Sequence, residues 1–167
     1  MRLGLSLAAV VLVLDQLSKY WILAVYDLPA KGSVEILPFF SLTMVWNRGI
    51  SLGLMQAGSD GARWLLVGVT LAVTMLLLFW LRTARQGMLR FGLGLVIGGA
   101  IGNIVDRIRF GAVADFVHLH GWGHDFYVFN IADSAITIGV GLLLVEAMLK
   151  PGSKSEEQSV TTTKGDA

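Results

Sequence analysis

An uncharged apolar run from Trp64 to Leu81 is the feature that most constrains what this chain can fold into. A helix of this length spans roughly 27 Å at a rise of about 1.5 Å per residue, close to the hydrocarbon thickness of a bilayer. The run has a tryptophan near each end, and this residue favours the membrane interface. The run therefore predicts a transmembrane helix. The mean hydropathy of the whole chain is +0.68, which indicates a membrane protein.

Three further apolar runs have the length of a membrane span, namely Leu3 to Val25, Leu89 to Val105 and Ile131 to Met148. The first follows a basic residue and is also typical of a secretory signal peptide. Asp15 and Lys19 interrupt that run, however, and no A-x-A-like cleavage site follows it. We therefore expect a retained first span and an all-α membrane protein with four transmembrane helices.

Basic residues between the second and third runs predict the orientation of the chain. Arg82, Arg85 and Arg90 crowd this short linker, and the positive-inside rule places such a linker in the cytoplasm. With four spans, both termini are then cytoplasmic and the long polar segments face outward.

The net charge of +1 gives no indication of a nucleic-acid partner, and the absence of cysteine excludes disulfides and thiolate chemistry.

The first outer segment, Asp27 to Ala62, is polar and rich in turn-forming residues. Within it, Val34 to Leu37 and Phe39 to Trp46 are rich in β-branched and aromatic residues, as short strands are. We expect a small extracytoplasmic β-sheet in this first outer loop, lying against the membrane surface. Asn47-Arg48-Gly49 is typical of a turn.

Polar and small residues inside the spans predict how the helices pack. Asp15 and Lys19 are four residues apart and share a helix face, so we expect an ion pair that serves packing rather than chemistry. Gly94, Gly98 and Gly102 recur at every fourth position, a spacing that lets a neighbouring helix approach closely.

A polar cluster near the outer end of the third run has two interpretations. Asn103 and Arg107 are one helical turn apart, and Asp106 lies beside them. Asp106 and Arg107 could form a structural clamp, or the cluster could position a reacting carboxylate. Since burying either charge unpaired is costly, both interpretations remain open at this point.

The second outer segment, Ile108 to Phe129, carries three histidines and two acids. These are Asp115, His118, His120, His124 and Asp125. Imidazole and carboxylate together suit zinc, but this spacing matches no established ligand pattern. We therefore interpret the histidines as surface residues of a loop and predict no metal site.

Asp115 and Asp133 are the candidate catalytic residues. Each lies where an apolar segment meets a polar one, and an acid near membrane-type sequence is costly to ionise and commonly functional. Two carboxyl groups close together cannot easily both ionise, so one holds a proton while the other stays charged, as an aspartic hydrolase requires. Asn130 is a good N-cap, which places Asp133 in the first turn of the last helix. Capping alone is the alternative explanation for Asp133.

Five motifs occur together in the chain. They are Leu14-Asp15-Gln16-Leu17-Ser18-Lys19, Asn47-x-Gly49, Gly98-Gly99-Ala100-x-Gly102-Asn103-x-x-Asp106-Arg107, Val113-Ala114-Asp115-Phe116 and Phe129-Asn130-Ile131-Ala132-Asp133-Ser134. In this order they resemble the motifs of the bacterial lipoprotein signal peptidase, or signal peptidase II, family. The resemblance covers about residues 4 to 150. It departs from the family at Ile50-Ser51-Leu52-Gly53, where the family often has small residues followed by an aromatic one.

The resemblance implies an aspartic endopeptidase of the bacterial inner membrane, with its active site at the outer, periplasmic face. The family cuts prolipoproteins before a diacylglyceryl-modified cysteine, so the implied partners are lipid-modified substrates and membrane lipid. It needs no cofactor. Asp115 and Asp133 would be the catalytic pair. Six residues would line or shape the substrate site, namely Asn47, Gly49, Asn103, Arg107, Asn130 and Ala132. Asp15, Lys19 and Asp106 would support the structure.

We expect a single integral membrane domain at 1–150, working as a monomer, and a disordered cytoplasmic tail at 151–167. Two other functions are alternatives. One is a small transporter that relays protons through Asp15, Asp115 and Asp133, which the large outer loops and the lack of an obvious inverted repeat disfavour. The other is a zinc-dependent membrane hydrolase that uses the histidines.

Overall fold

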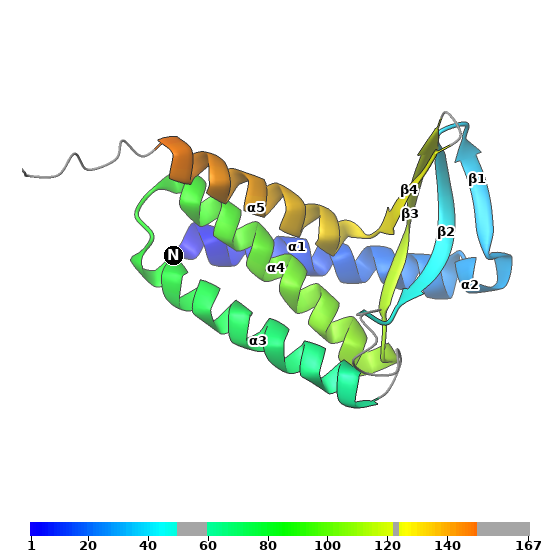
Figure 1. Cartoon of the computed structure of the whole chain (residues 1–167), viewed down its shortest axis with the longest axis horizontal. Helices are drawn as coiled ribbons and strands as arrows, with labels where there is room; N and C mark the ends of the chain where they lie inside the picture. The colour runs from blue at the N-terminus through cyan, green and yellow to red at the C-terminus, as the bar shows by residue number, and fades with distance from the viewer. Residues whose placement is uncertain (50–59, 122–123, 150–167) are drawn as a thin grey trace, which may run out of the picture.

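Four long helices form a bundle with a β-sheet at one end, as the computed structural model of the chain shows (Figure 1). The structure describes residues 1–49, 60–121 and 124–149. The helices are α1 (Arg2–Tyr20), continued by a π-helical turn η1 (Trp21–Val25), a short α2 (Leu28–Lys31), α3 (Asp60–Thr83), α4 (Gly87–Phe110) and α5 (Ile131–Leu149). Within the described residues, α1 with η1, α3, α4 and α5 are long and apolar enough to cross a membrane, as predicted. The 151–167 tail and the Ile50 to Gly53 motif lie outside the described residues.

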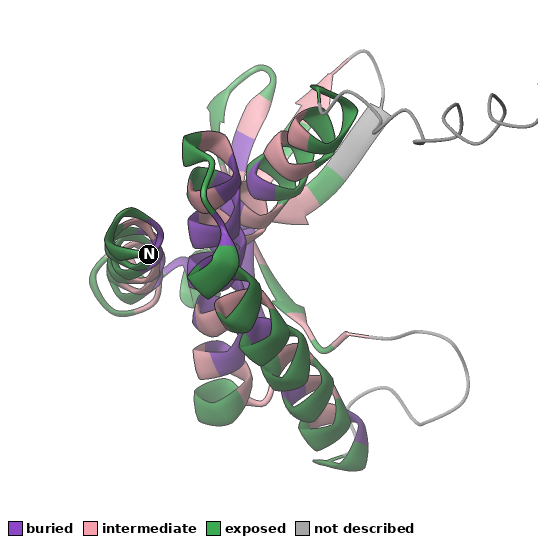
Figure 2. Cartoon of the chain, turned by 90° about the vertical axis from the view of Figure 1, so that its left-hand side faces the viewer, coloured by how far each residue is buried: buried purple, intermediate pink, exposed green. Residues whose placement is uncertain are grey.

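Helix α4 is the centre of the bundle, because α1, α3 and α5 each pack against it. About 67% of its membrane-spanning stretch is buried, against 28% or less for the other three helices (Figure 2). The other helices therefore expose long apolar faces, which suits a surrounding bilayer rather than water.

Glycines on α4 allow this close packing, as the spacing predicted. Gly94, Gly98 and Gly102 all face α1, and a Cβ atom at Gly98 would lie only 2.6 Å from the backbone oxygen of Ala8. Gly99 faces α5 in the same way. Small residues on both sides of α4 thus bring three helices together at backbone contact distance.

We expect Gly98→Ala to lower the free energy of unfolding by roughly 1–3 kcal/mol, because the added methyl group meets backbone that cannot move aside easily. Gly68→Ala on α3 is the matched control, since a Cβ atom there has no neighbour within 4 Å; its effect should stay within roughly 1 kcal/mol. Unfolding in detergent measures both, and equal stability of the two variants would contradict the packing argument.

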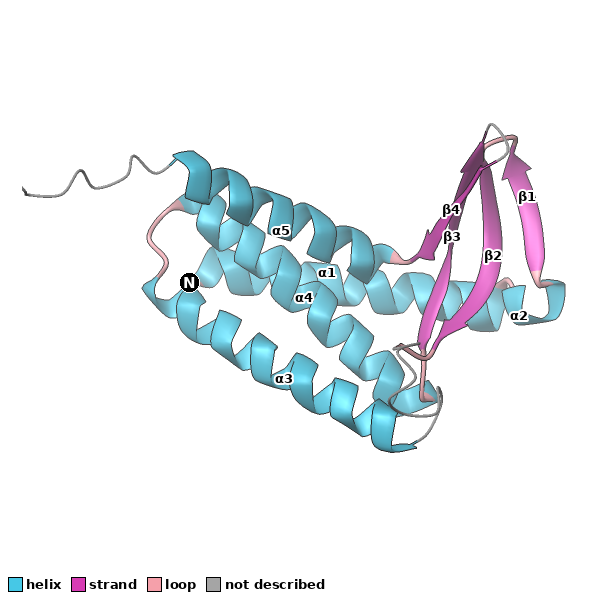
Figure 3. Cartoon of the chain, in the orientation of Figure 1, coloured by secondary structure: helices cyan, strands magenta, loops and turns pink. Residues whose placement is uncertain are grey.

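The sheet has four antiparallel strands in the order β1 (Ser33–Leu37), β2 (Phe40–Asn47), β3 (Val113–Gly121) and β4 (His124–Phe129) (Figure 3). The first two lie in the first outer segment, as predicted. The prediction missed β3 and β4, which fall in the segment that we expected to be a loop. The alternation of Val117 and Leu119 with His118 and His120 was the available signal, because strand residues point to opposite faces in turn.

The pairing of β2 with β3 matters for the site, because it sets Val45 opposite Asp115 and Asn47 opposite Val113. Side chains that share a face of neighbouring strands then lie close together. Helix α4 also runs further than expected, past Val105 to Phe110, and ends at Gly111 in the left-handed conformation (φ 77°). The sheet and the ends of α4 and α5 therefore meet at one place.

Candidate active site

Asp115 and Asp133 come from different elements and meet on either side of Asn130. The Asn130 side-chain amide donates a 2.6 Å hydrogen bond to Asp115 Oδ1, and its backbone N–H donates to Asp133 Oδ2 at 3.3 Å. Asp115 lies on β3 and is fully buried, whereas Asp133 is half-buried in the first turn of α5. The two carboxyl groups thus share one buried asparagine as a hydrogen-bond donor.

Asn130 is the N-cap of α5, as predicted. Its Oδ1 accepts a 2.9 Å hydrogen bond from the backbone N–H of Asp133, while Asp133 accepts one in return. This reciprocal pattern is a capping box. Asp133 can therefore take part in the cap and in the site at the same time, because the cap uses only Oδ2 and leaves Oδ1 for another partner.

Two further asparagines complete the hydrogen bonds. Asn103 Nδ2 donates to Asp133 Oδ1 at 2.8 Å, and Asn47 Nδ2 donates to Asp115 Oδ2 at 3.0 Å. All four carboxyl oxygens of the pair therefore accept a bond from an asparagine N–H group. These donors are neutral, so they orient the carboxyl groups without the strong preference for ionisation that a cation partner imposes.

Burial raises the pKa of Asp115 from 3.8 to about 6, and the negative charge of Asp133 acts in the same direction. The hydrogen bonds from Asn47 and Asn130 oppose this shift but do not cancel it. A proton held near pH 6 is what two neighbouring carboxyl groups are expected to share.

The predicted ion pair between Asp15 and Lys19 is present and belongs to a buried cluster. Lys19 Nζ lies 2.9 Å from Asp15 Oδ2 and 2.7 Å from Asp106 Oδ2. Gln16 bridges the two acids through hydrogen bonds of 3.1 and 3.0 Å. Asp15 and Asp106 are both fully buried and Lys19 is 2% exposed, so these charges rely on one another rather than on water.

This cluster holds the backbone next to each candidate catalytic aspartate. Asp106 Oδ2 accepts a 3.1 Å bond from the N–H of Ala114, and Asp15 Oδ1 accepts one of 3.1 Å from the N–H of Ala132. Ala114 and Ala132 immediately precede Asp115 and Asp133. Ala132 itself is fully buried against α4, so it shapes the site rather than lining it.

The proposed clamp between Asp106 and Arg107 is wrong. Asp106 pairs with Lys19 instead, and residues adjacent in a helix point about 100° apart, so they do not face each other. The guanidinium group of Arg107 lies near enough to Asp115 and Asp133 for their charges to act on it. Its Nε is the buried side-chain nitrogen in the described part of the chain that has no hydrogen-bond partner.

Asn47 combines the two roles considered for it. Its Oδ1 accepts a 2.9 Å bond from the N–H of Gly49, which forms the turn, while its amide nitrogen reaches Asp115. Gly49 has a φ of 80°, in the region where a residue with a side chain is strained. The spacing Asn-x-Gly therefore fixes both the turn and the orientation of the amide.

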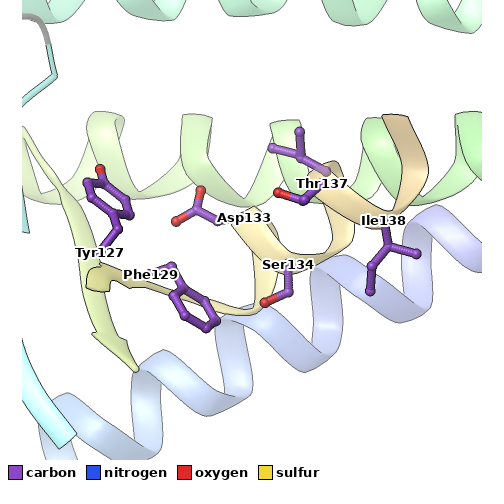
Figure 4. A pocket seen from close by; sticks show the side chains of 7 residues that line it. Tyr127, Phe129, Asp133, Ser134, Thr137 and Ile138 are labelled. Atoms are coloured by element: carbon purple, nitrogen blue, oxygen red, sulfur yellow. The ribbon is translucent and has the colours of Figure 1, made fainter. Parts of the chain in front are cut away.

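A pocket of about 630 Å³ opens beside Asp133 (Figure 4). Seven residues from β4 and α5 line it, namely Tyr127, Phe129, Asp133, Ser134, Ile136, Thr137 and Ile138. Most of its surface is apolar, with the Asp133 carboxyl group as its acidic member. Tyr127 was not among the predicted site residues, because an aromatic residue in an outer loop has no distinguishing sequence pattern.

The histidines of β3 are engaged within the sheet. His120 Nε2 lies 2.8 Å from Ser41 Oγ, and His118 Nδ1 lies 3.3 Å from Thr43 Oγ1. The side chains of His124 and Asp125 lie outside the described residues. In the described part of the chain, no three histidine, aspartate or glutamate side chains are grouped as metal ligands.

Comparison with known proteins agrees with this architecture. Residues 7–149 match the family model of signal peptidase (SPase) II. The lipoprotein signal peptidase of Methylobacterium sp. strain 4-46 is 51% identical over 146 residues, which cover 87% of this chain and 88% of that protein. The lipoprotein signal peptidase of Methylorubrum extorquens strain PA1 is 43% identical over 164 residues, covering 98% of this chain and 95% of its own.

Two solved structures of bacterial membrane enzymes, obtained by the in meso method at 2.3 and 1.9 Å resolution, share the fold with TM-scores of 0.75. Their sequence identities are 29% and 32%. The first alignment covers 93% of both chains, and the second covers 88% of this chain and 92% of the other. With four membrane-spanning helices and relatives of this identity over most of its length, the chain belongs to the signal peptidase II family of multi-pass bacterial membrane peptidases.

Proposed function

We propose that this chain is an aspartic endopeptidase that removes the signal peptide from prolipoproteins by cutting before a diacylglyceryl-modified cysteine. Family membership supports prolipoprotein signal-peptide cleavage. One observation supports the aspartic mechanism above all others. Asp115 and Asp133 are hydrogen-bonded to the same Asn130, beside a pocket that reaches Asp133.

In the proposed mechanism the pair holds one proton. The ionised carboxylate accepts a proton from a water molecule as the water oxygen attacks the peptide carbonyl carbon. The protonated carboxyl group donates a hydrogen bond to the carbonyl oxygen, on which negative charge develops. When the carbon–nitrogen bond breaks, the leaving amine takes up a proton from the pair. The proton belongs to the pair rather than to one aspartate.

The residues around the pair have positioning and binding roles in this proposal. The cluster of Asp15, Lys19 and Asp106 fixes the backbone at both aspartates through Ala114 and Ala132. Three asparagines, Asn47, Asn103 and Asn130, orient the carboxyl groups. Arg107, with a free Nε, and the turn at Gly49 would contact or shape the bound peptide.

We place the site at the periplasmic face of the inner membrane. The sheet lies at the bundle end where α4 finishes and α5 begins, opposite the end at which α3 and α4 connect (Figure 1). Arg82, Arg85 and Arg90 belong to that opposite end and are expected to be cytoplasmic, together with both termini. The acyl chains of the substrate would then stay in lipid while the sheet covers the peptide.

A cleavage assay tests the proposed function. Purified protein is mixed with a precursor peptide that carries a diacylglyceryl cysteine, and with the same peptide lacking the lipid, each with and without EDTA. We expect cleavage before the modified cysteine only, unaffected by the chelator. Inhibition by EDTA that zinc reverses would favour the metal-dependent hydrolase, and no cleavage at all would favour the transporter.

The pH dependence of the reaction follows from the raised pKa of Asp115. The pair keeps its proton below about pH 6 and loses it above, so kcat/KM should fall above that pH by up to about tenfold per pH unit. Folding stability should also decrease as pH rises from 3.8 towards 6, because the folded state holds a proton that the unfolded chain releases. Measured kcat/KM values that stay constant between about pH 5 and 9 would be inconsistent with a shared proton.

A further inference from the structure

Tyr127 is joined to the candidate catalytic pair through Asn47. Asn47 Nδ2 donates a 2.7 Å hydrogen bond to the Tyr127 hydroxyl oxygen and a 3.0 Å bond to Asp115 Oδ2. A side-chain amide nitrogen carries two hydrogens, so both bonds can exist at once. The Tyr127 hydroxyl group is therefore held at a fixed position relative to Asp115.

The orientation of the Asn47 amide leaves one interpretation of this contact. Because Asn47 Oδ1 accepts the N–H of Gly49, its nitrogen must be the atom that faces Tyr127. The Tyr127 oxygen is then the acceptor, and its own hydrogen is directed elsewhere. No described residue accepts that hydrogen.

Tyr127 also lies where a substrate would pass. Its side chain is 69% exposed and lines the pocket together with Asp133 and Phe129 (Figure 4). The hydroxyl of Ser134, in the same pocket, already donates to the backbone oxygen of Asn130 at 3.0 Å. Although most of the residue is exposed, partial burial of its hydroxyl group and the charges of Asp115 and Asp133 raise the pKa of Tyr127 above 10.0, so the hydroxyl keeps its proton.

A peptide that enters this pocket leaves water, and its backbone carbonyl groups then need new donors. We propose that the Tyr127 hydroxyl group donates a hydrogen bond to a backbone carbonyl of the bound signal peptide near the scissile bond. Tyr127 is thus a substrate-binding residue that sets the position of the peptide relative to Asp115. This inference rests on the proposed peptidase function.

Tyr127→Phe removes the hydroxyl group and keeps the ring. Loss of one neutral hydrogen bond to the substrate should raise KM roughly 2- to 10-fold. Because Asp115 keeps its bond from Asn47, kcat should change less than about twofold and the pH profile of kcat should not shift. Steady-state cleavage of the lipid-modified precursor peptide measures both constants. Tyr20→Phe is the matched control, since Tyr20 is an exposed tyrosine on α1 that does not line the pocket, and should leave both constants unchanged.

The possible outcomes separate this inference from a bracing role. A decrease in kcat at unchanged KM, or a shifted pH profile, would mean that the hydroxyl group acts only through Asn47 and Asp115. An unchanged KM with normal kcat would mean that it contacts no substrate. Either result overturns the inference while leaving the peptidase function intact. Failure of the unaltered protein to cleave would overturn the proposed function, and this inference with it.

Discussion

Replacing Asp115 or Asp133 with asparagine is expected to lower the rate of prolipoprotein cleavage by roughly 10²–10⁴-fold. The amide is nearly isosteric with the carboxyl group, but it can neither accept a proton from water nor supply one to the leaving amine. In Asp133→Asn the backbone N–H of this residue can still donate to Asn130 Oδ1, and the side-chain amide oxygen can still accept the N–H of Asn130. The variants should therefore accumulate in the membrane in folded form. Single-turnover cleavage of the lipid-modified peptide measures the loss.

Asp27→Asn is the matched control for this experiment. Asp27 is exposed and has a φ of 53°, a conformation that asparagine also tolerates. Its variant should cleave at the unaltered rate. If Asp115→Asn or Asp133→Asn kept substantial turnover beside this control, the aspartic mechanism would be excluded and the zinc-dependent alternative would gain support.

Lys19→Met should lower the free energy of unfolding by roughly 3–5 kcal/mol, because it leaves two buried carboxylates without their cation. Lys19 is 2% exposed and contacts both Asp15 and Asp106. Methionine nearly retains the length of the side chain, so the loss reflects charge more than volume. Since Asp15 and Asp106 also hold the backbone beside the catalytic pair, cleavage should fall together with stability.

Lys31→Met supplies the comparison, since Lys31 is exposed and its ammonium group bonds the backbone oxygen of Tyr26. Exposed ion contacts contribute little, so this variant should lose less than about 1 kcal/mol. Unfolding in detergent gives both values. Equal losses in the two variants would show that the buried cluster does not stabilise the bundle as argued.

The sequence allowed the prediction of features that depend on local spacing. The four spans, the regularly spaced glycines of α4 (Gly94, Gly98 and Gly102) and the cap at Asn130 each depend on residues within one helix or one turn. The pairing of Asp15 with Lys19 is of the same kind, because four residues correspond to about one helical turn.

Features that depend on contacts between distant segments could not be predicted from spacing. Nothing in the sequence links Asp106 to Lys19, 87 positions earlier, and one of the two interpretations left open paired Asp106 with its neighbour Arg107, a contact that the helix geometry excludes. The bond between Asn47 and Tyr127 likewise exists only because β2, β3 and β4 pair in one sheet. The strand β3 was also missed, because polar histidines at alternating positions of the second outer segment are as typical of a surface loop as of a strand with one exposed face.

Asp115 and Asp133 act as one unit in the proposed mechanism, and the double variant Asp115→Asn with Asp133→Asn tests this most directly. The effects on rate of replacing residues that act together are not additive, so replacing the second aspartate should lower the rate little once the first has been replaced. We predict that the single-turnover rate of the double variant equals that of either single variant to within about threefold. A double variant whose loss equals the product of the two single losses would show that the aspartates act independently, and would contradict the shared-proton mechanism.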